Sequence, residues 1–273
     1  MKKIVFGILI ILFGFVGYLF LFGKLFAFTP LIIGFTKHEL INTIFYTQKG
    51  SEYNDSGLID TLIPSIERFH ELRFTKKPKI FIFNDSLTYI HHSLSKARFC
   101  AFSSGRLFIS PWALKEAKEG KISMIIYTKH ELSHVLILQH KGIFSELNFP
   151  KWLLEGIAMY SANQMGTSFY PSKDETYKAI AQGNFLAPFD FKTKKENRTK
   201  LNVKYRAAFI YSEFACIVDY LVLNYGKDKF ILYMKDLIKN NNHNKIFKKY
   251  YGIDFDESIV ELKKYVMQNE KQI

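Results

Sequence analysis

An uncharged run of about twenty residues near the amino terminus constrains this chain more than any other feature. The run extends from Ile4 to Gly23, follows Met1, Lys2 and Lys3, and is rich in Ile, Leu and Phe. Twenty helical residues span about 30 Å, the thickness of the hydrocarbon core of a bilayer. A cleaved signal peptide is the alternative, but its apolar region is about 7–15 residues long. We therefore predict one transmembrane helix that is retained as a signal anchor.

The charges that flank this run predict its orientation. Lys2 and Lys3 favour a cytoplasmic amino terminus by the positive-inside rule, and Lys24 on the other flank weakens that bias. The rest of the chain would then lie outside the cytoplasmic membrane, either in a periplasm or at the cell exterior. Residues 25–35 are also uncharged, but they contain Pro30 and are too short to span. We expect them to form an interfacial or packing segment.

Composition excludes several classes of protein. Hydrophobic residues make up 48% of the chain and charged residues 23%, which excludes a wholly disordered protein. Two cysteines, Cys100 and Cys216, exclude a disulfide-rich scaffold and leave either one disulfide or two free thiols open. The net charge is +13, but the lysines are scattered and no nucleic-acid-binding signature accompanies them. We predict a solvated basic surface and no nucleic-acid partner.

Hydrophobic periodicity and turn residues predict an α+β domain at residues 36–273, behind an anchor and juxtamembrane segment at residues 1–35. The first half, residues 36–142, is predicted to contain both helices and strands, and the second half, residues 143–273, to be helical. The predicted helices are 36–47, 58–69, 87–96, 122–141, 150–166, 205–224, 227–239 and 256–267. The predicted strands are 79–83 and a hairpin or pair of edge strands at 99–102 and 106–109.

The predicted helix at 122–141 carries the motif His130-Glu131-Leu132-Ser133-His134. Residues four apart on a helix share a face, so both imidazoles can point at one metal ion. Glu131 lies one residue past the first of them, where its carboxylate can reach a water molecule bound to that metal. Both flanks of the motif are apolar, which indicates a buried helix. A metal ion is the simplest partner for buried histidines, because burying them unpaired is costly.

A second copy of part of this motif occurs earlier in the chain. Lys37-His38-Glu39-Leu40 repeats residues 129–132, but Asn42 stands where the second histidine would be. We therefore expect the early copy to be structural.

A third metal ligand is expected from the segment that follows the motif. Glu155 is the only acid in residues 149–160, where Trp152 and its neighbours leave little polar surface for it. The adjacent Gly156 is predicted to permit close approach of the helix that carries the motif.

The combination of H-E-L-S-H and, about twenty residues later, W-L-x-E-G-x-A-x-Y resembles the gluzincin zinc metallopeptidases. The closest resemblance is to the bacterial peptidase MA-like group. It implies a thermolysin-like fold, with a small mixed sheet and an active-site helix followed by a helical half. It also implies that His130, His134 and Glu155 bind Zn²⁺ and that Glu131 acts as general base and acid.

The resemblance extends more weakly to the rest of the domain. It implies that residues 106–109 form the edge strand along which an extended peptide pairs. It also implies that Tyr211 stabilises the oxyanion, with Tyr205 and Tyr160 as alternatives. The chain departs from thermolysin-like members at Met159, where they have an Asp that orients a ligand histidine.

These expectations define a membrane-anchored zinc metallopeptidase that hydrolyses a peptide or protein substrate. Two alternatives remain open at this point. An intramembrane zinc protease would carry the same motif but would need further spanning helices. A non-catalytic, membrane-tethered envelope scaffold or binding protein would have a structural metal site or none.

Overall fold

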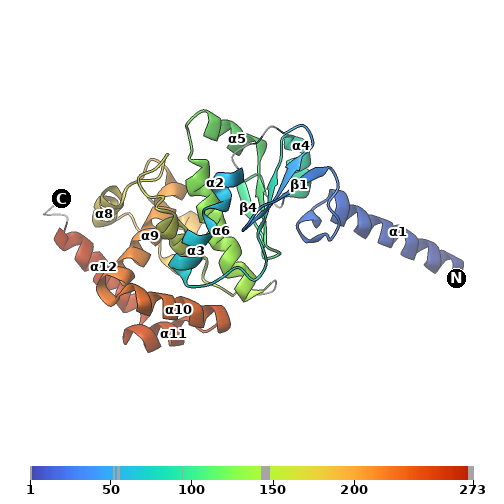
Figure 1. The fold of residues 1–273 in the computed structure, drawn as a ribbon. Coiled ribbons are helices and arrows are strands. Elements are labelled where there is room, and N and C mark those ends of the chain that lie inside the picture. The colour runs from blue at the N-terminus through green and yellow to red at the C-terminus, as the bar shows by residue number, and fades with distance from the viewer. Residues whose placement is uncertain (1, 52, 54–55, 94, 143–147, 270–273) are drawn as a thin grey trace.

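The computed structural model describes residues 2–51, 53, 56–93, 95–142 and 148–269. Figure 1 shows an apolar helix, α1 (Lys2–Phe22), which projects from a body made of a sheet with its helices and a helical carboxyl-terminal half. In the described part of the chain, two helices are long and apolar enough to cross a membrane. None of α1 is buried in the body, whereas 72% of an apolar 18-residue stretch in the other candidate, α9 (Arg206–Tyr225), is buried. α9 is therefore a core helix, and α1 is the candidate membrane span.

The sheet has five strands in the described residues and mixes parallel with antiparallel pairing. The order across the sheet is β1-β2-β3-β5-β4. The strands are β1 (Phe35–Glu39), β2 (Ile44–Gln48), β3 (Lys79–Ile82), β4 (Phe99–Ala101) and β5 (Arg106–Ile109). β3 is parallel to both β2 and β5, whereas β1 and β4 pair antiparallel with their neighbours. The prediction of a small mixed sheet, including the hairpin at 99–109, is confirmed.

Two predictions about this sheet are wrong. Residues 36–47 do not form a helix, because they form the hairpin β1–β2. The turn of that hairpin is held from outside, since Asp60 accepts hydrogen bonds from the Asn42 amide (2.9 Å) and the Thr43 hydroxyl (2.6 Å). β5 is not the edge strand either, because it lies between β3 and β4. β4 is the edge strand on this side of the sheet, and β1 is the edge strand on the other side.

Helices follow in the order that hydrophobic periodicity predicts, with three additions, and the predicted helix 58–69 is two helices, α2 and α3. The helices are α2 (Ser56–Asp60), α3 (Ile63–His70), α4 (Ser86–His92), α5 (Pro111–Lys118), α6 (Met124–Lys141), α7 (Lys151–Ala162), α8 (Lys173–Ala181), α9, α10 (Lys227–Lys239), α11 (His243–Tyr251) and α12 (Phe255–Asn269). Short 3-10 turns lie at η1 (Phe26–Phe28), η2 (Pro188–Asp190) and η3 (Glu196–Arg198). α5, α8 and α11 were not predicted. The predicted boundary between the two halves adjoins residues 143–147, which lie outside the described residues.

The two faces of the sheet pack against different partners. On β3, Ile80 and Ile82 face a cluster that includes α6, whereas Phe81 and Phe83 face a cluster that includes η1 and α4. This alternation is expected for a strand, because successive side chains point to opposite faces.

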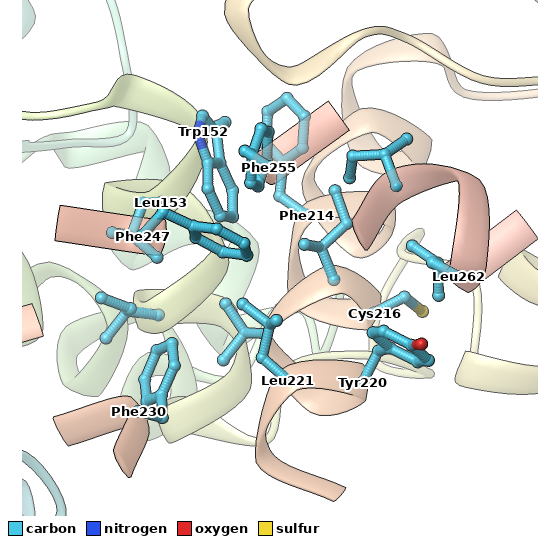
Figure 2. Packing of buried hydrophobic residues seen from close by; sticks show 14 of the residues in the cluster. Trp152, Leu153, Phe214, Cys216, Tyr220, Leu221, Phe230, Phe247, Phe255 and Leu262 are labelled. Atoms are coloured by element: carbon cyan, nitrogen blue, oxygen red, sulfur yellow. The ribbon is translucent and has the colours of Figure 1, made fainter. Parts of the chain in front are cut away.

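The helical half has its own core. α7 packs along α9, and α10, α11 and α12 close the cluster around them. Figure 2 shows Trp152 and Leu153 of α7 packed among side chains such as Phe214, Phe247 and Phe255. This packing fixes the position of α7 relative to the rest of the body.

Both cysteines are free thiols in this structure. Cys100 lies on β4 and contacts the Tyr89 hydroxyl, whereas Cys216 is buried in α9 beside Met165. The structure therefore favours two separate thiols over the disulfide that the sequence left open.

Candidate metal centre

The motif helix α6 begins and ends where its capping residues predict. The Ser123 hydroxyl accepts a hydrogen bond from the Ile126 amide at the start, and Gly142 follows the last residue. Such a side-chain cap satisfies one of the amides left free at a helix start. Ten α6 residues are buried, including Leu132–Leu138. The apolar residues thus hold the helix against the sheet, and its two histidines are buried with it.

α7 brings Glu155 to these histidines. The helix starts after Pro150, and its apolar residues are buried in the helical core. A Cβ atom added to Gly156 would lie 2.7 Å from the carbonyl oxygen of Phe214 in α9. The close approach that Gly156 permits is therefore to α9, not to the motif helix as the sequence analysis predicted. α7 is pressed against α9 behind the site, and Glu155 lies on the side toward α6.

Three potential metal ligands converge at this point. The Nε2 atoms of His130 and His134 lie 3.0 Å apart. Oε2 of Glu155 lies 3.4 Å from Nε2 of His130 and 3.3 Å from Nε2 of His134. All three side chains are buried. Burial alone would raise the pKa of Glu155, but the charges and hydrogen bonds of His134 and His130 outweigh it and hold this pKa well below its usual range. The group could hold a metal ion.

The outer nitrogens of these histidines are buried without an acceptor. Nδ1 of His130 and Nδ1 of His134 have no hydrogen-bond partner within the described residues. Met159, at the position of the missing Asp, is fully buried and offers no carboxylate. In known metal sites this nitrogen usually donates to a carboxylate, a carbonyl or a water molecule.

A cleft of about 620 Å³ opens beside the three residues. The predicted site residues Glu131 and Tyr211 both line it, together with residues of β4 and α6. Desolvation raises the pKa of Glu131 to about 7, and Glu155 adds to this effect, although His130 opposes it. A carboxyl group with a pKa near neutrality is suited to accept and to return a proton.

Tyr211 comes from α9, far along the chain from the motif. Its ring lies nearly parallel to that of His130, with the ring centroids 6.5 Å apart and an interplanar angle of 13°. Burial and the Glu155 carboxylate raise the pKa of Tyr211, so its hydroxyl remains a proton donor. The alternatives lie elsewhere, since Tyr205 packs on Phe169 and Tyr160 on Phe69.

Some residues of the site were missed by sequence reasoning. Nζ of Lys192 lies 3.5 Å from Oε1 of Glu155, whereas the two histidines contact Oε2. Tyr170 also lines the cleft. Lys192 begins a lysine-rich segment, and nothing in the composition of that segment marks this one lysine.

A further residue supports the motif from behind. Nε2 of His70 lies 2.8 Å from the hydroxyl of Ser133, inside the motif, and Nδ1 of His70 lies 2.8 Å from the Ile66 carbonyl. Burial lowers the pKa of His70 to about 4, so the ring is neutral. This neutral ring joins α3 to the helix that bears the candidate ligands. The contact joins residues 63 positions apart, and no local pattern indicates it.

The comparison with known families agrees with this geometry. A model of the peptidase MA superfamily matches residues 115–268, which include α6, α7 and α9 and therefore every candidate ligand. No curated protein matches the chain. Peptidases of this superfamily are typically metal-dependent, and the buried His130, His134 and Glu155 are consistent with that chemistry. Because the match covers more than half of the sequence, this chain belongs to the peptidase MA superfamily.

Proposed function

We propose that this protein is a membrane-anchored zinc peptidase of the gluzincin type, with a thermolysin-like arrangement of its catalytic residues. The observation that carries the proposal is the convergence of His130, His134 and Glu155 from two helices beside a cleft that Glu131 also lines. Membership of the peptidase MA superfamily supports hydrolysis of peptide bonds.

The ligand set fits zinc. A tetrahedral zinc ion bonded at about 2.0–2.1 Å separates neighbouring ligand atoms by about 3.3 Å. The three observed separations of 3.0, 3.3 and 3.4 Å are close to this value. Two imidazole nitrogens and one carboxylate oxygen are also a ligand set found in catalytic zinc sites. His130, His134 and Glu155 would therefore hold the ion and leave one coordination position open. Zinc bound there would supply Lewis acidity, which lowers the pKa of water and polarises a carbonyl group.

Glu131 would move the proton during hydrolysis. Its carboxylate would accept a proton from the attacking water and then donate it to the departing amine. Its position in the cleft and its pKa of about 7 suit both steps. Tyr211 would donate its hydroxyl hydrogen to the oxyanion that develops on the substrate carbonyl. The Lys192 ammonium would be a second positive charge beside Glu155, in addition to the zinc ion.

The substrate would bind as an extended strand along β4. β4 is the end strand of the sheet, and Phe99, Cys100 and Ala101 all line the cleft. An exposed strand edge offers backbone groups to an extended peptide, which gives affinity with little dependence on sequence. This geometry supports a peptide or protein substrate.

α1 would anchor the protein in the cytoplasmic membrane. Its apolar length and its lack of burial support a membrane span. Lys2 and Lys3 support a cytoplasmic amino terminus, with the peptidase domain outside the cytoplasm.

Peptide hydrolysis by the full chain in detergent tests the proposal against a non-catalytic scaffold. We expect hydrolysis of unstructured peptides to stop when a chelator removes the metal and to return when zinc is added. Glu131→Gln is expected to keep its zinc and lose turnover. A well-folded, zinc-loaded wild type that hydrolyses peptides no faster than Glu131→Gln would instead support the scaffold.

A further inference from the structure

The residues that join α1 to the body are built into the fold. The Gly23 amide donates to the Leu19 carbonyl (3.1 Å), and the Phe26 amide donates to the Gly23 carbonyl (3.0 Å). Backbone hydrogen bonds therefore continue from α1 into η1 without a flexible linker. Figure 1 shows α1 leaving the body directly at the side of the sheet.

Phe26 anchors this junction to the sheet. Its side chain is fully buried, and its ring lies 5.6 Å from the ring of Phe81 and 4.2 Å from that of His92, centroid to centroid. The guanidinium of Arg106, on β5, donates to the Phe26 carbonyl (2.6 Å) and also to the Thr29 carbonyl. Arg106 is itself buried, so these bonds are shielded from competing water.

Lys24 holds the other side of the junction. Its ammonium donates to the Ser93 carbonyl (2.7 Å) and to the Ile90 carbonyl, at the carboxyl end of α4. A cation is favourable there because the free carbonyls carry the negative end of the helix dipole. Contacts on both sides therefore fix the direction in which α1 leaves the body.

The same junction forms one wall of the cleft. Phe28 is among the residues that line it, and its ring lies 6.4 Å from the ring of Phe102, just beyond β4. Phe28 lies only six positions after Phe22, the last residue of α1. Six residues reach at most about 20 Å even when fully extended. This end of the cleft is therefore within about 20 Å of the end of the apolar helix.

Apolar side chains next to the junction are consistent with a surface that rests on lipid. Leu31 is 62% exposed and Ile33 is 50% exposed, shortly after Phe26, Ala27 and Thr29, which are buried. Exposed apolar side chains beside a membrane span are stabilised where they contact the interface.

We propose that the cleft takes extended polypeptide segments that lie close to the membrane surface, in substrates that are themselves inserted in or attached to that membrane. This inference rests on the proposed peptidase function. The rigid junction sets the height of the cleft above the membrane, and an anchored substrate lies at the same membrane surface. Sharing a surface raises the effective concentration of segments at that height, whereas segments held farther away cannot reach the cleft.

Cleavage of anchored reporters by the full chain in zinc-containing proteoliposomes tests this inference. One unstructured segment, first chosen because the wild type hydrolyses it as a free peptide, is placed in two single-pass reporters. In the first reporter it follows the span directly. In the second it lies beyond a folded, protease-resistant domain that lifts it away from the membrane. A variant has about 20 Gly/Ser residues inserted between Phe22 and Gly23. This flexible insertion lets the cleft move to different heights above the membrane but leaves Lys24, Phe26 and Phe28 in place.

We expect the wild type to cleave the membrane-proximal segment at least about tenfold faster than the lifted one, and the insertion variant to cleave both at similar rates. Equal cleavage of both reporters by the wild type, or an unchanged ratio in the insertion variant, would overturn the inference. Hydrolysis of the free peptide separates this outcome from failure of the peptidase proposal. If the wild type hydrolyses that peptide no faster than Glu131→Gln, the proposed function fails and the inference fails with it.

Discussion

The same four residues, Lys-His-Glu-Leu, occur in two regions of this protein with different structures. Residues 37–40 lie mostly in the edge strand β1, where His38 and Glu39 are exposed. Residues 129–132 lie in the core helix α6, where His130 is buried and faces His134 and Glu155. Nε2 of His38 lies 3.2 Å from the Thr47 hydroxyl, which is not a metal ligand of the kind found at His130. The four shared residues are therefore not sufficient for a candidate metal site. Such a site also needs the second histidine, burial of the ligands and the carboxylate from α7.

The largest expected difference between the two regions is in how a Glu→Gln substitution in each affects peptide hydrolysis. Glu131→Gln is expected to lower peptide hydrolysis by about 10²–10⁴-fold, because it removes the group that would move the proton. Glu39→Gln is the matched control, since Glu39 forms exposed ion pairs with Lys37 and Lys77 at the surface. It is expected to leave both turnover and stability unchanged, because exposed ion pairs contribute little. Hydrolysis rates of the two purified variants test this, and equal losses would remove the distinction between the regions.

The position of α7 can be changed without touching a ligand. Gly156→Ala places a methyl group 2.7 Å from the Phe214 carbonyl oxygen, so α7 must move relative to α9. We expect a loss of about 1–3 kcal/mol in unfolding free energy and weaker zinc retention, because Glu155 precedes the substituted residue. Gly57→Ala in α2 is the control, since its added Cβ meets open space. Denaturant unfolding and zinc competition measure both effects, and wild-type zinc affinity in a folded Gly156→Ala protein would contradict this account.

The strand structure of the early copy depends on a contact from α2. Asp60→Ala removes the acceptor for Asn42 and Thr43 at the β1–β2 turn. Buried donors left unpaired are expected to cost about 1–3 kcal/mol of unfolding free energy. Zinc content should stay unchanged, because Asp60 bonds to Asn42 and Thr43 and not to the candidate ligands. Loss of zinc with unchanged stability would show that the two regions are not independent.

Burial of a glutamate without suitable partners is expected to affect stability only. Glu213 in α9 is fully buried and accepts one hydrogen bond from the Leu186 amide (3.0 Å). Burial raises its pKa well above the usual value, although the Leu186 amide and Lys263 oppose this. Because the folded-state pKa is the higher one, the wild type loses stability as pH rises above the unfolded-state pKa of about 4.3.

Glu213→Gln removes this pH dependence and keeps the hydrogen-bond acceptor. Its stability relative to wild type is expected to rise, on the order of 1 kcal/mol, between about pH 5 and about pH 8. Thermal unfolding at both pH values measures the difference. A difference that stays constant with pH would show that Glu213 does not carry the assigned shift.

The parts of the fold that were predicted from sequence are those with strong local signals. The position of α6 followed from its apolar run and from Gly142, and its Ser123 cap agrees. The hairpin β1–β2 was missed because β2 is held between β1 and β3, and because Asp60 fixes its turn from α2. Strand order was also missed, since nothing local decides that β5 is interior and β4 is at the edge.

Two of the missed helices carried signals that could have been read. The Ser172 hydroxyl and the Glu175 carboxylate form a capping box at the start of α8, with the expected spacing of three residues. Ser110 caps α5, and Pro111 occupies its first turn. Both helices are short and only partly apolar, so hydrophobic periodicity alone did not indicate them.

The candidate ligands were predictable because a helix places residues four apart on one face. Tyr211 was predicted only through a family resemblance, because it reaches the cleft from a distant helix. Lys192 and His70 were missed, since their contacts join segments well separated in sequence. The chemistry of the motif is thus local, whereas the residues around it depend on the complete fold.

Zinc content of the purified full chain, measured by elemental mass spectrometry, is the direct test of the proposed metal site. We expect about one zinc per chain in the wild type and in His38→Ala, and a loss of zinc in Glu155→Ala. A folded wild type without zinc, or Glu155→Ala with undiminished zinc, would contradict the three-ligand site.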